Sequence, residues 1–127
     1  MTVPRALVID DEPLVLEVFA QALERAGYDV VTARNGREGL HEFRRGRVDL
    51  IVTDLFMPEV DGLEFLRALR AVNATVPVIA ISGGGELERA DLLPLARALG
   101  AAHVLAKPVE LADLVAAARA LVPTPPA

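Results

Sequence analysis

The sequence of 127 residues contains no cysteine, no tryptophan and only two histidines. Without cysteine, the chain can form no disulfide, no thiolate nucleophile and no cysteine-ligated zinc or iron–sulfur site. The two histidines, His41 and His103, are too few for a metal centre built from several imidazoles. A single tyrosine and no tryptophan argue against a stacking platform for single-stranded nucleic acid.

Positive net charge and long apolar runs are missing as well. Thirteen basic residues stand against 18 acidic ones, and the formal charge of −5 argues against non-specific binding to nucleic acid phosphates. No apolar run approaches the roughly 18 residues of a membrane-spanning helix. The apolar residues 6–9 lead directly into two aspartates, unlike the core of a signal peptide. We therefore expect one cytoplasmic domain that contacts neither nucleic acid nor a membrane.

Short apolar runs and longer amphipathic stretches alternate five times along the sequence. The runs are continuous and mostly rich in β-branched residues, which is typical of strands buried on both faces. They cover residues 6–9, 30–32, 50–53, 76–81 and 103–106. The stretches between them repeat apolar residues at steps of three and four, as helices do. This alternation predicts an α/β domain with a doubly wound parallel sheet.

Proline, glycine and asparagine mark the ends of the first two predicted helices. Pro13 suits the first turn of the first helix, and Gly27 suits the position after its end. Apolar residues from Leu14 to Ala26 recur on one face of this helix. Asn35 is placed to cap the second helix.

The fourth helix and the C-terminal tail are less regular. Pro94 would break a helix that began earlier, but it fits the first turn of a helix capped by Asp91. Residues 82–91 are therefore predicted to be mostly loop. The Pro-rich residues 123–127 cannot continue the last helix, so the predicted domain covers residues 1–122.

Polar residues stand at the carboxyl ends of four predicted strands, the edge where function gathers in a doubly wound sheet. Taken alone, each is explained as a helix-terminal acid, a turn residue or a solvated amine. Their common placement at one edge favours a shared site. They are Asp10, Asp11 and Glu12 after the first strand, Asp54 after the third, Ser82 after the fourth and Lys107 after the fifth.

The chemistry of this set favours magnesium and phosphate. Clustered carboxylates repel one another unless a cation or a proton neutralises them, and their hard oxygens suit Mg²⁺. Lys107 and Ser82 offer a positive charge and a hydroxyl to a phosphoryl group. A carboxylate at the centre, Asp54, can attack phosphorus and form an aspartyl phosphate.

In order and spacing, these residues resemble the receiver domains of two-component response regulators. The resemblance covers residues 4–122, and its motifs lie at residues 8–13, 49–58, 61–62, 77–83 and 100–108. It implies a CheY-like, flavodoxin-like fold with five helices and a five-stranded parallel sheet in the order 2-1-3-4-5. It also implies a stand-alone receiver that signals through partners.

The resemblance implies a role for each site residue. Asp54 would accept a phosphoryl group from a histidine kinase or phosphotransfer protein, and Ser82 and Lys107 would contact that group. Mg²⁺ would be bound by Asp10, Asp11, Asp54 and the backbone carbonyl of Phe56. The bond between Lys107 and Pro108 would often be cis in this family.

By the same resemblance, the chain would catalyse only its own phosphorylation and dephosphorylation and turn over no external substrate. It would bind a downstream protein through the face formed by the fourth helix, the fifth strand and the fifth helix, or act as a phosphate sink.

The sequence departs from the family pattern at one switch position. Family members usually carry tyrosine or phenylalanine where this chain has Val104. The adjacent His103 cannot replace the ring, because neighbouring strand residues point to opposite faces; we expect His103 at or near the surface and His41 exposed on the second helix. We hypothesise that ordering of the loop after Ser82 replaces the aromatic switch, and that Phe56 and Gly84 set the phosphoryl lifetime.

Three other functions compete with this interpretation. A receiver-fold binding module could work without phosphorylation. An aspartyl-phosphate phosphatase would need a second acid two residues after the nucleophile, where Phe56 stands. A flavin-binding protein would need a phosphate loop after the first strand, where Asp10, Asp11 and Glu12 would repel phosphate.

Overall fold

Five parallel strands form one sheet in the order β2-β1-β3-β4-β5, as predicted. The computed structural model describes residues 2–55, 62–83, 94 and 96–125. The predictions for Phe56, Gly84, Asp91 and most of the loop at 82–91 lie outside the described residues. The strands are β1 (Arg5–Ile9), β2 (Asp29–Ala33), β3 (Leu50–Asp54), β4 (Val78–Ser82) and β5 (His103–Ala106).

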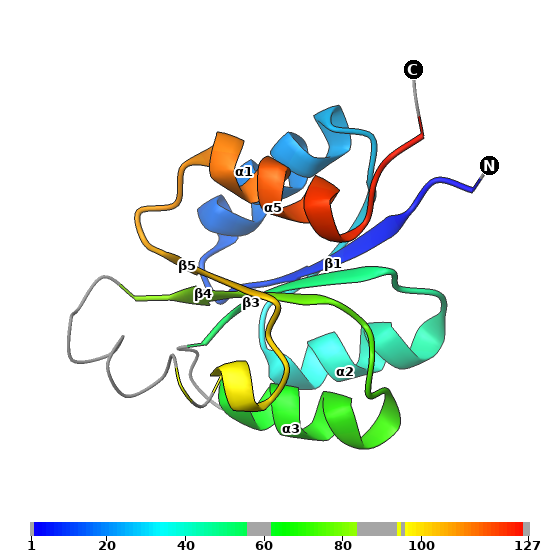
Figure 1. Ribbon diagram of the computed structural model, residues 1–127, viewed down its shortest axis with the longest axis vertical. Helices are drawn as coiled ribbons and strands as arrows, with labels where there is room; N and C mark the ends of the chain where they lie inside the picture. Colours follow the sequence, from blue (N-terminus) through cyan, green and yellow to red (C-terminus); the bar gives the residue numbers. More distant parts are fainter. Residues whose placement is uncertain (1, 56–61, 84–93, 95, 126–127) are drawn as a thin grey trace.

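Helices cover both faces of the sheet (Figure 1). On one face lie α1 (Pro13–Arg25) and α5 (Leu111–Leu121), and on the other lie α2 (Gly36–Arg45) and α3 (Gly62–Val72). Residues 96–98 are also helical, in the place expected for the fourth of five helices. The predicted doubly wound α/β class is therefore confirmed. No helix among the described residues has the length and apolar composition needed to cross a membrane.

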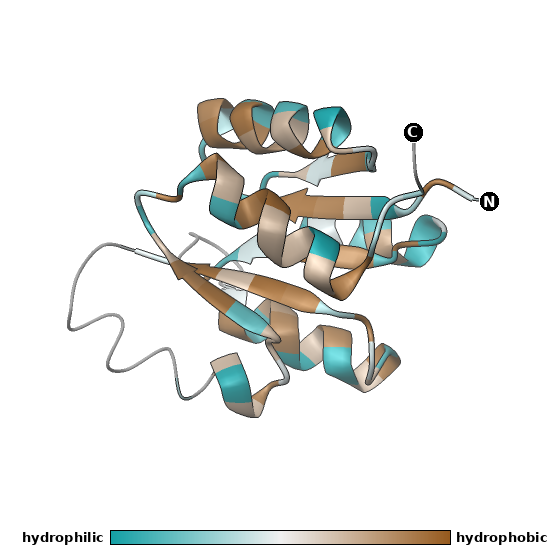
Figure 2. Cartoon of the chain, turned by 45° about the horizontal axis from the view of Figure 1, so that its top comes forward, coloured by the Kyte–Doolittle hydropathy of each residue, from teal (hydrophilic) through white to brown (hydrophobic). Residues whose placement is uncertain are grey.

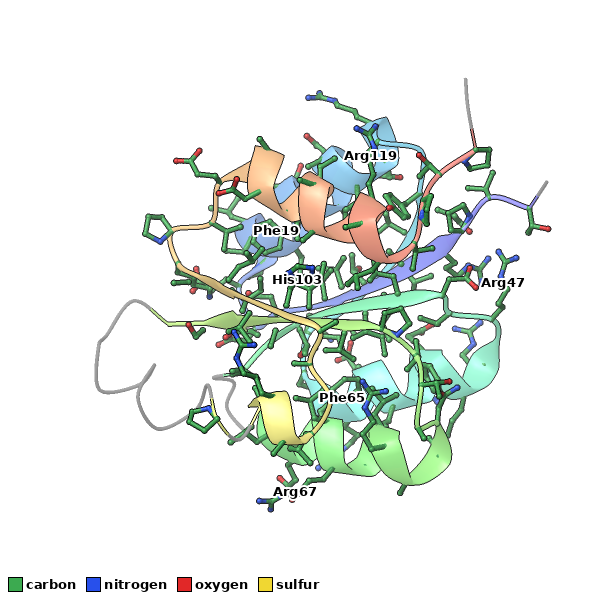
Figure 3. All side chains as sticks on the ribbon, in the orientation of Figure 1. Phe19, Arg47, Phe65, Arg67, His103 and Arg119 are labelled. Carbon is green, nitrogen blue, oxygen red and sulfur yellow. The ribbon has the colours of Figure 1, made fainter. Side chains whose placement is uncertain are left out.

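The core is divided by the sheet into two apolar layers. The strands are predominantly hydrophobic (Figure 2), and every residue of β3 and β4 is buried. Phe19 of α1 packs in the layer beneath α1 and α5, and Phe65 of α3 packs in the opposite layer (Figure 3). Burial on both faces explains why the apolar runs in the sequence are continuous rather than alternating.

The predicted ends of α1 and α2 are confirmed. Pro13 occupies the first turn of α1, and Gly27 beyond its end has φ of +104°, in the left-handed region. Asn35 caps α2, because its side-chain oxygen accepts a hydrogen bond from the Glu38 amide at 2.9 Å.

One local prediction needs correction, and one helix face is only partly covered. The fourth strand begins at Val78 rather than residue 76, because Pro77 has no N–H to donate to the ladder. The apolar face of α1 is wider than its contact with the core: Leu14 is 75% exposed and Val18 is 45% exposed. Helical periodicity shows which residues share a face, but it does not show how much of that face a neighbouring element covers.

The C-terminal segment after α5 lies against the turn between α1 and β2. The hydroxyl of the buried Tyr28 donates a hydrogen bond to the Val122 carbonyl at 2.6 Å. A methyl group at Gly27 would lie 3.2 Å from the side chain of Thr124, which places these two residues in close contact. The helix ends at Leu121, in agreement with the start of the Pro-rich tail.

Candidate functional site

The register of the parallel strands brings the predicted site residues to one edge of the sheet. Asp54 pairs with Ile81, the residue before Ser82. Ser82 pairs with Ala106, the residue before Lys107. Ile9, the residue before Asp10, pairs with Thr53. Each of these side chains therefore stands at the carboxyl end of its strand, beside the next.

Lys107 is the centre of the cluster. Its Nζ donates a hydrogen bond to Asp54 Oδ2 at 3.0 Å, and lies 3.4 Å from Asp10 Oδ2 and 3.8 Å from Glu12 Oε1. Asp10 and Asp54 are almost fully buried, at 1% and 3% exposure. One amine thus offsets two buried carboxylates and contacts a third at the rim.

Burial and the neighbouring charges shift the pKa values of Asp10 and Lys107. The pKa of Asp10 is raised to about 6, because burial and the charge of Asp54 together outweigh the Glu12 backbone N–H and Lys107, which both lower it. For Lys107, burial lowers the pKa, but the neighbouring Asp54 and Asp10 outweigh it, so the net pKa is raised. The lysine therefore stays charged, whereas the metal-free cluster readily takes up a proton at Asp10.

Two buried polar atoms lack a hydrogen-bond partner within the described part of the chain. They are Asp10 Oδ2, which has only the ion-pair contact with Lys107, and Ser82 Oγ. A buried oxygen without a donor is costly, so such atoms at a functional edge are typical of a ligand-binding site. Ser82 is completely buried, so water does not hydrate its hydroxyl in place of a protein partner.

The donor set fits a hard divalent cation. Carboxylate oxygens of Asp10, Asp11 and Glu12 lie within 4.8 Å of one another, with Asp10 buried and the other two exposed. An Mg²⁺ ion takes oxygen ligands and keeps several waters, which suits a half-open acidic cluster. The predicted ligands Asp10, Asp11 and Asp54 are at this edge, and Phe56 lies outside the described residues. Sequence reasoning noted Glu12 but did not name it as a ligand.

Two features of the Lys107 backbone lie beside Ser82 at the end of β4. The Lys107 amide donates to the Ser82 carbonyl at 3.0 Å. The peptide bond between Lys107 and Pro108 is cis, in agreement with the expectation from the resemblance.

An apolar groove of about 550 Å³ borders the acidic cluster. It is lined by Leu14, Val15, Val18 and Phe19 of α1 and by the segment from Lys107 to Val109 before α5. The stem of Lys107 therefore forms a wall of the groove, while its amine lies among the carboxylates. Sequence reasoning missed this groove, because it assigned Leu14 and Val18 only to a shared helix face.

The two histidines and the switch position lie where the sequence predicts. His103 is exposed on β5 (Figure 3), and His41 is exposed on α2. Val104 is half-buried against the layer beneath α2 and α3, whereas Leu105 packs against the opposite layer. This alternation confirms that His103 does not occupy the place of the usual aromatic ring.

A family model of the response regulator receiver domain matches residues 6–119. The chain belongs to this family. Among curated proteins, the receiver domain is 40% identical over 121 residues to the transcriptional regulatory protein PrrA of Mycobacterium bovis, covering 95% of this chain and 51% of PrrA. It is 36% identical over 128 residues to a probable transcriptional regulatory protein of Picosynechococcus, covering 94% of the chain and 49% of that protein. The chain spans about half the length of these curated relatives.

Solved structures show the same fold. A receiver domain protein from Clostridium thermocellum superposes with a TM-score of 0.85 at 35% identity, covering 94% of each chain. The response regulator TrrA of Thermotoga maritima, solved in complex with Mg²⁺ and BeF, superposes with a TM-score of 0.82 at 31% identity, covering 94% of this receiver and 99% of TrrA.

Proposed function

We propose that this receiver domain accepts a phosphoryl group on Asp54 from the phosphohistidine of a histidine kinase or phosphotransfer protein. The observation that carries the proposal is the contact of Lys107 with Asp54 at 3.0 Å, beside the unpartnered hydroxyl of Ser82. A phosphoryl group placed on Asp54 would meet a cation and a hydroxyl that already lie at the edge of the sheet.

The reaction is a displacement at phosphorus. A carboxylate oxygen of Asp54 forms the new P–O bond while the P–N bond to the donor histidine breaks, and the departing imidazole keeps the electron pair and takes a proton from water. Lys107 stays protonated and pairs with the charge that develops on the phosphoryl oxygens. The Ser82 hydroxyl would donate a hydrogen bond to one of those oxygens.

Magnesium is part of this proposal. The residues that would hold it are Asp10, Asp11 and Asp54, with Glu12 at the rim, and Phe56 through its backbone carbonyl as the family resemblance implies. When bound, Mg²⁺ supplies positive charge that offsets the crowded carboxylates and the phosphoryl oxygens. The complex of TrrA with Mg²⁺ and BeF supports this assignment.

The domain would turn over no external substrate in this proposal. Water would release phosphate from Asp54, which resets the chain or makes it a phosphate sink. The groove beside Lys107 is the side from which we expect the donor protein to reach Asp54, since its wall and the site share one side chain. Output would pass to a partner through the face that includes β5 and α5.

The curated relatives bear on where that output goes. They are named as transcriptional regulators and are about twice as long as the matched segment. We therefore propose control of transcription as the downstream effect. That the receiver is stand-alone, cytoplasmic and free of direct nucleic acid contact stays a prediction.

Intact mass after incubation with acetyl phosphate tests the function. The wild type, Asp54→Asn and Asp49→Asn would each be treated with and without Mg²⁺. Asp49 is the matched control, because its carboxylate accepts a hydrogen bond from the Arg5 backbone N–H at the opposite edge of the sheet. We expect one phosphoryl group on the wild type and on Asp49→Asn, only with Mg²⁺, and none on Asp54→Asn. No gain on a wild type that binds Mg²⁺ would instead favour a binding module that works without phosphorylation.

A further inference from the structure

Gly62, the first residue of α3, lies directly behind the phosphoacceptor. It is buried, and its amide donates a hydrogen bond to the Leu55 carbonyl at 3.1 Å. A methyl group at this position would overlap the carbonyl oxygen of Asp54 and lie 2.5 Å from the Cα of Leu55. The atoms in the way all belong to the backbone that carries Asp54, so no side-chain rotation relieves the overlap.

The backbone in front of Gly62 is also held from its other sides. The Leu55 amide donates to the Ile81 carbonyl of β4 at 2.9 Å. The Asp54 carbonyl accepts a hydrogen bond from the Thr53 hydroxyl at 3.1 Å. The end of β3 is therefore fixed between β4 and the start of α3, and a larger residue at position 62 must displace one of them.

We propose that Gly62 is a positioning residue for phosphorylation of Asp54. Because Gly62 has no side chain, the first turn of α3 packs directly against the peptide between Asp54 and Leu55. This contact sets the distance from the Asp54 carboxylate to Lys107 and to the other acids. This inference rests on the proposed function of Asp54. It assigns part of the site geometry to a residue that touches neither phosphate nor metal.

Gly39 of α2 provides a matched control in the same apolar layer. A methyl group there would lie 2.5 Å from Ile9 Cδ1 and 3.1 Å from Phe65 Cε1. These are the far ends of side chains, which can shift without moving the backbone. Gly39→Ala therefore crowds the core beneath α2 and α3, whereas Gly62→Ala crowds the end of β3 itself.

The decisive comparison measures Mg²⁺ affinity by titration calorimetry, labelling by acetyl phosphate and unfolding by urea for both variants. We expect both to lose stability. Only Gly62→Ala should lose Mg²⁺ affinity by about tenfold or more and labelling rate by about 100-fold, the scale of losses when a supporting group shifts a site. Wild-type affinity and rate in Gly62→Ala, or equal losses in both variants, would overturn the proposal. A wild type that binds Mg²⁺ but takes no phosphoryl group would count against Asp54 as the acceptor, while the affinities would still decide the role of Gly62.

Amide hydrogen exchange in the wild type covers the case in which Gly62→Ala does not fold. The Gly62 amide binds the Leu55 carbonyl, and the Gly39 amide binds the Asn35 carbonyl at 2.9 Å. With Mg²⁺ and beryllofluoride, exchange of the Gly62 amide should slow by about threefold or more, because ordering of the site raises local protection, while exchange of the Gly39 amide should not change. Equal responses of the two amides would contradict the proposal.

Discussion

At the amino edge of the sheet, the Arg5 guanidinium binds the Asp29 carboxylate at 3.0 Å, and the Arg5 backbone N–H donates a hydrogen bond to the Asp49 carboxylate at 2.8 Å. The Arg47 guanidinium lies 3.3 Å from the same Asp49 carboxylate. At the carboxyl edge, Lys107 alone faces several carboxylates, and a buried hydroxyl has no partner among the described residues. The two edges of the sheet therefore differ: acidic and basic side chains are paired at the amino edge, whereas carboxylates outnumber the lysine at the carboxyl edge.

The difference indicates that the amino edge contributes to stability and the carboxyl edge to ligand binding. At the amino edge, each of these charges already contacts an opposite charge or a carbonyl, so we expect a bound ion to increase stability little there. At the carboxyl edge, the excess of carboxylates over cations makes the metal-free fold less stable, and a bound cation or phosphoryl group recovers that free energy. Variants at the two edges should consequently respond differently to Mg²⁺.

Loss of the lysine at the carboxyl edge should have the largest effect on the free energy of unfolding. Lys107→Met leaves Asp54 and Asp10 buried without their cation, so we expect the metal-free free energy of unfolding to fall by about 4 kcal/mol at alkaline pH. Mg²⁺ should recover part of this loss. Urea unfolding with EDTA and with Mg²⁺ measures both. A loss below about 1 kcal/mol would mean that the lysine does not hold the carboxylates together.

The next effect is a reversed pH dependence at Asp10. Its pKa is about 6 in the fold against an ordinary 3.8, so the folded state binds the extra proton between these values. Stability from this group should therefore fall as pH rises from about 4 to 6, by about 3 kcal/mol at most. Other carboxylates titrate in the same range, so the measurement is the difference between wild type and Asp10→Asn in EDTA. An identical pH profile for the two would contradict the prediction.

The smallest expected effect lies near the amino edge. The Arg70 guanidinium of α3 donates hydrogen bonds to the carbonyls of Val76, Leu99 and Gly100 at 2.8 to 3.0 Å. Arg70→Met should cost about 2 kcal/mol, because charge-assisted bonds to backbone carbonyls are lost. The cost should be the same with EDTA and with Mg²⁺. A cost that Mg²⁺ removes would show that the two edges are not independent.

The fold and the placement of the site could be predicted from the sequence for one reason. Strands buried on both faces leave continuous apolar runs, and a parallel sheet gathers all their carboxyl ends at one edge. Asp10, Asp54 and Lys107 each follow directly on such a run, so their meeting follows from topology without knowledge of any distance.

Other features depend on tertiary contacts that no local pattern encodes. The exposure of Leu14 depends on where the segment before α5 passes, and the contacts of Arg70 join α3 to residues some 30 positions away. The overlap at Gly62 depends on how closely α3 approaches β3. These are products of packing, and the sequence shows them only as an apolar residue, an arginine and a glycine.

Lys107 is the only lysine of the sequence, and the other residues counted with it as Lys or Arg are all arginines. Reductive methylation with isotope-labelled formaldehyde reacts with amines and leaves guanidinium groups unchanged, and a methylated amine keeps its positive charge. Besides the α-amino group, the label would enter at one side chain, 3.0 Å from Asp54. A single resonance would then report metal binding, proton uptake and phosphorylation from inside the site of the intact protein.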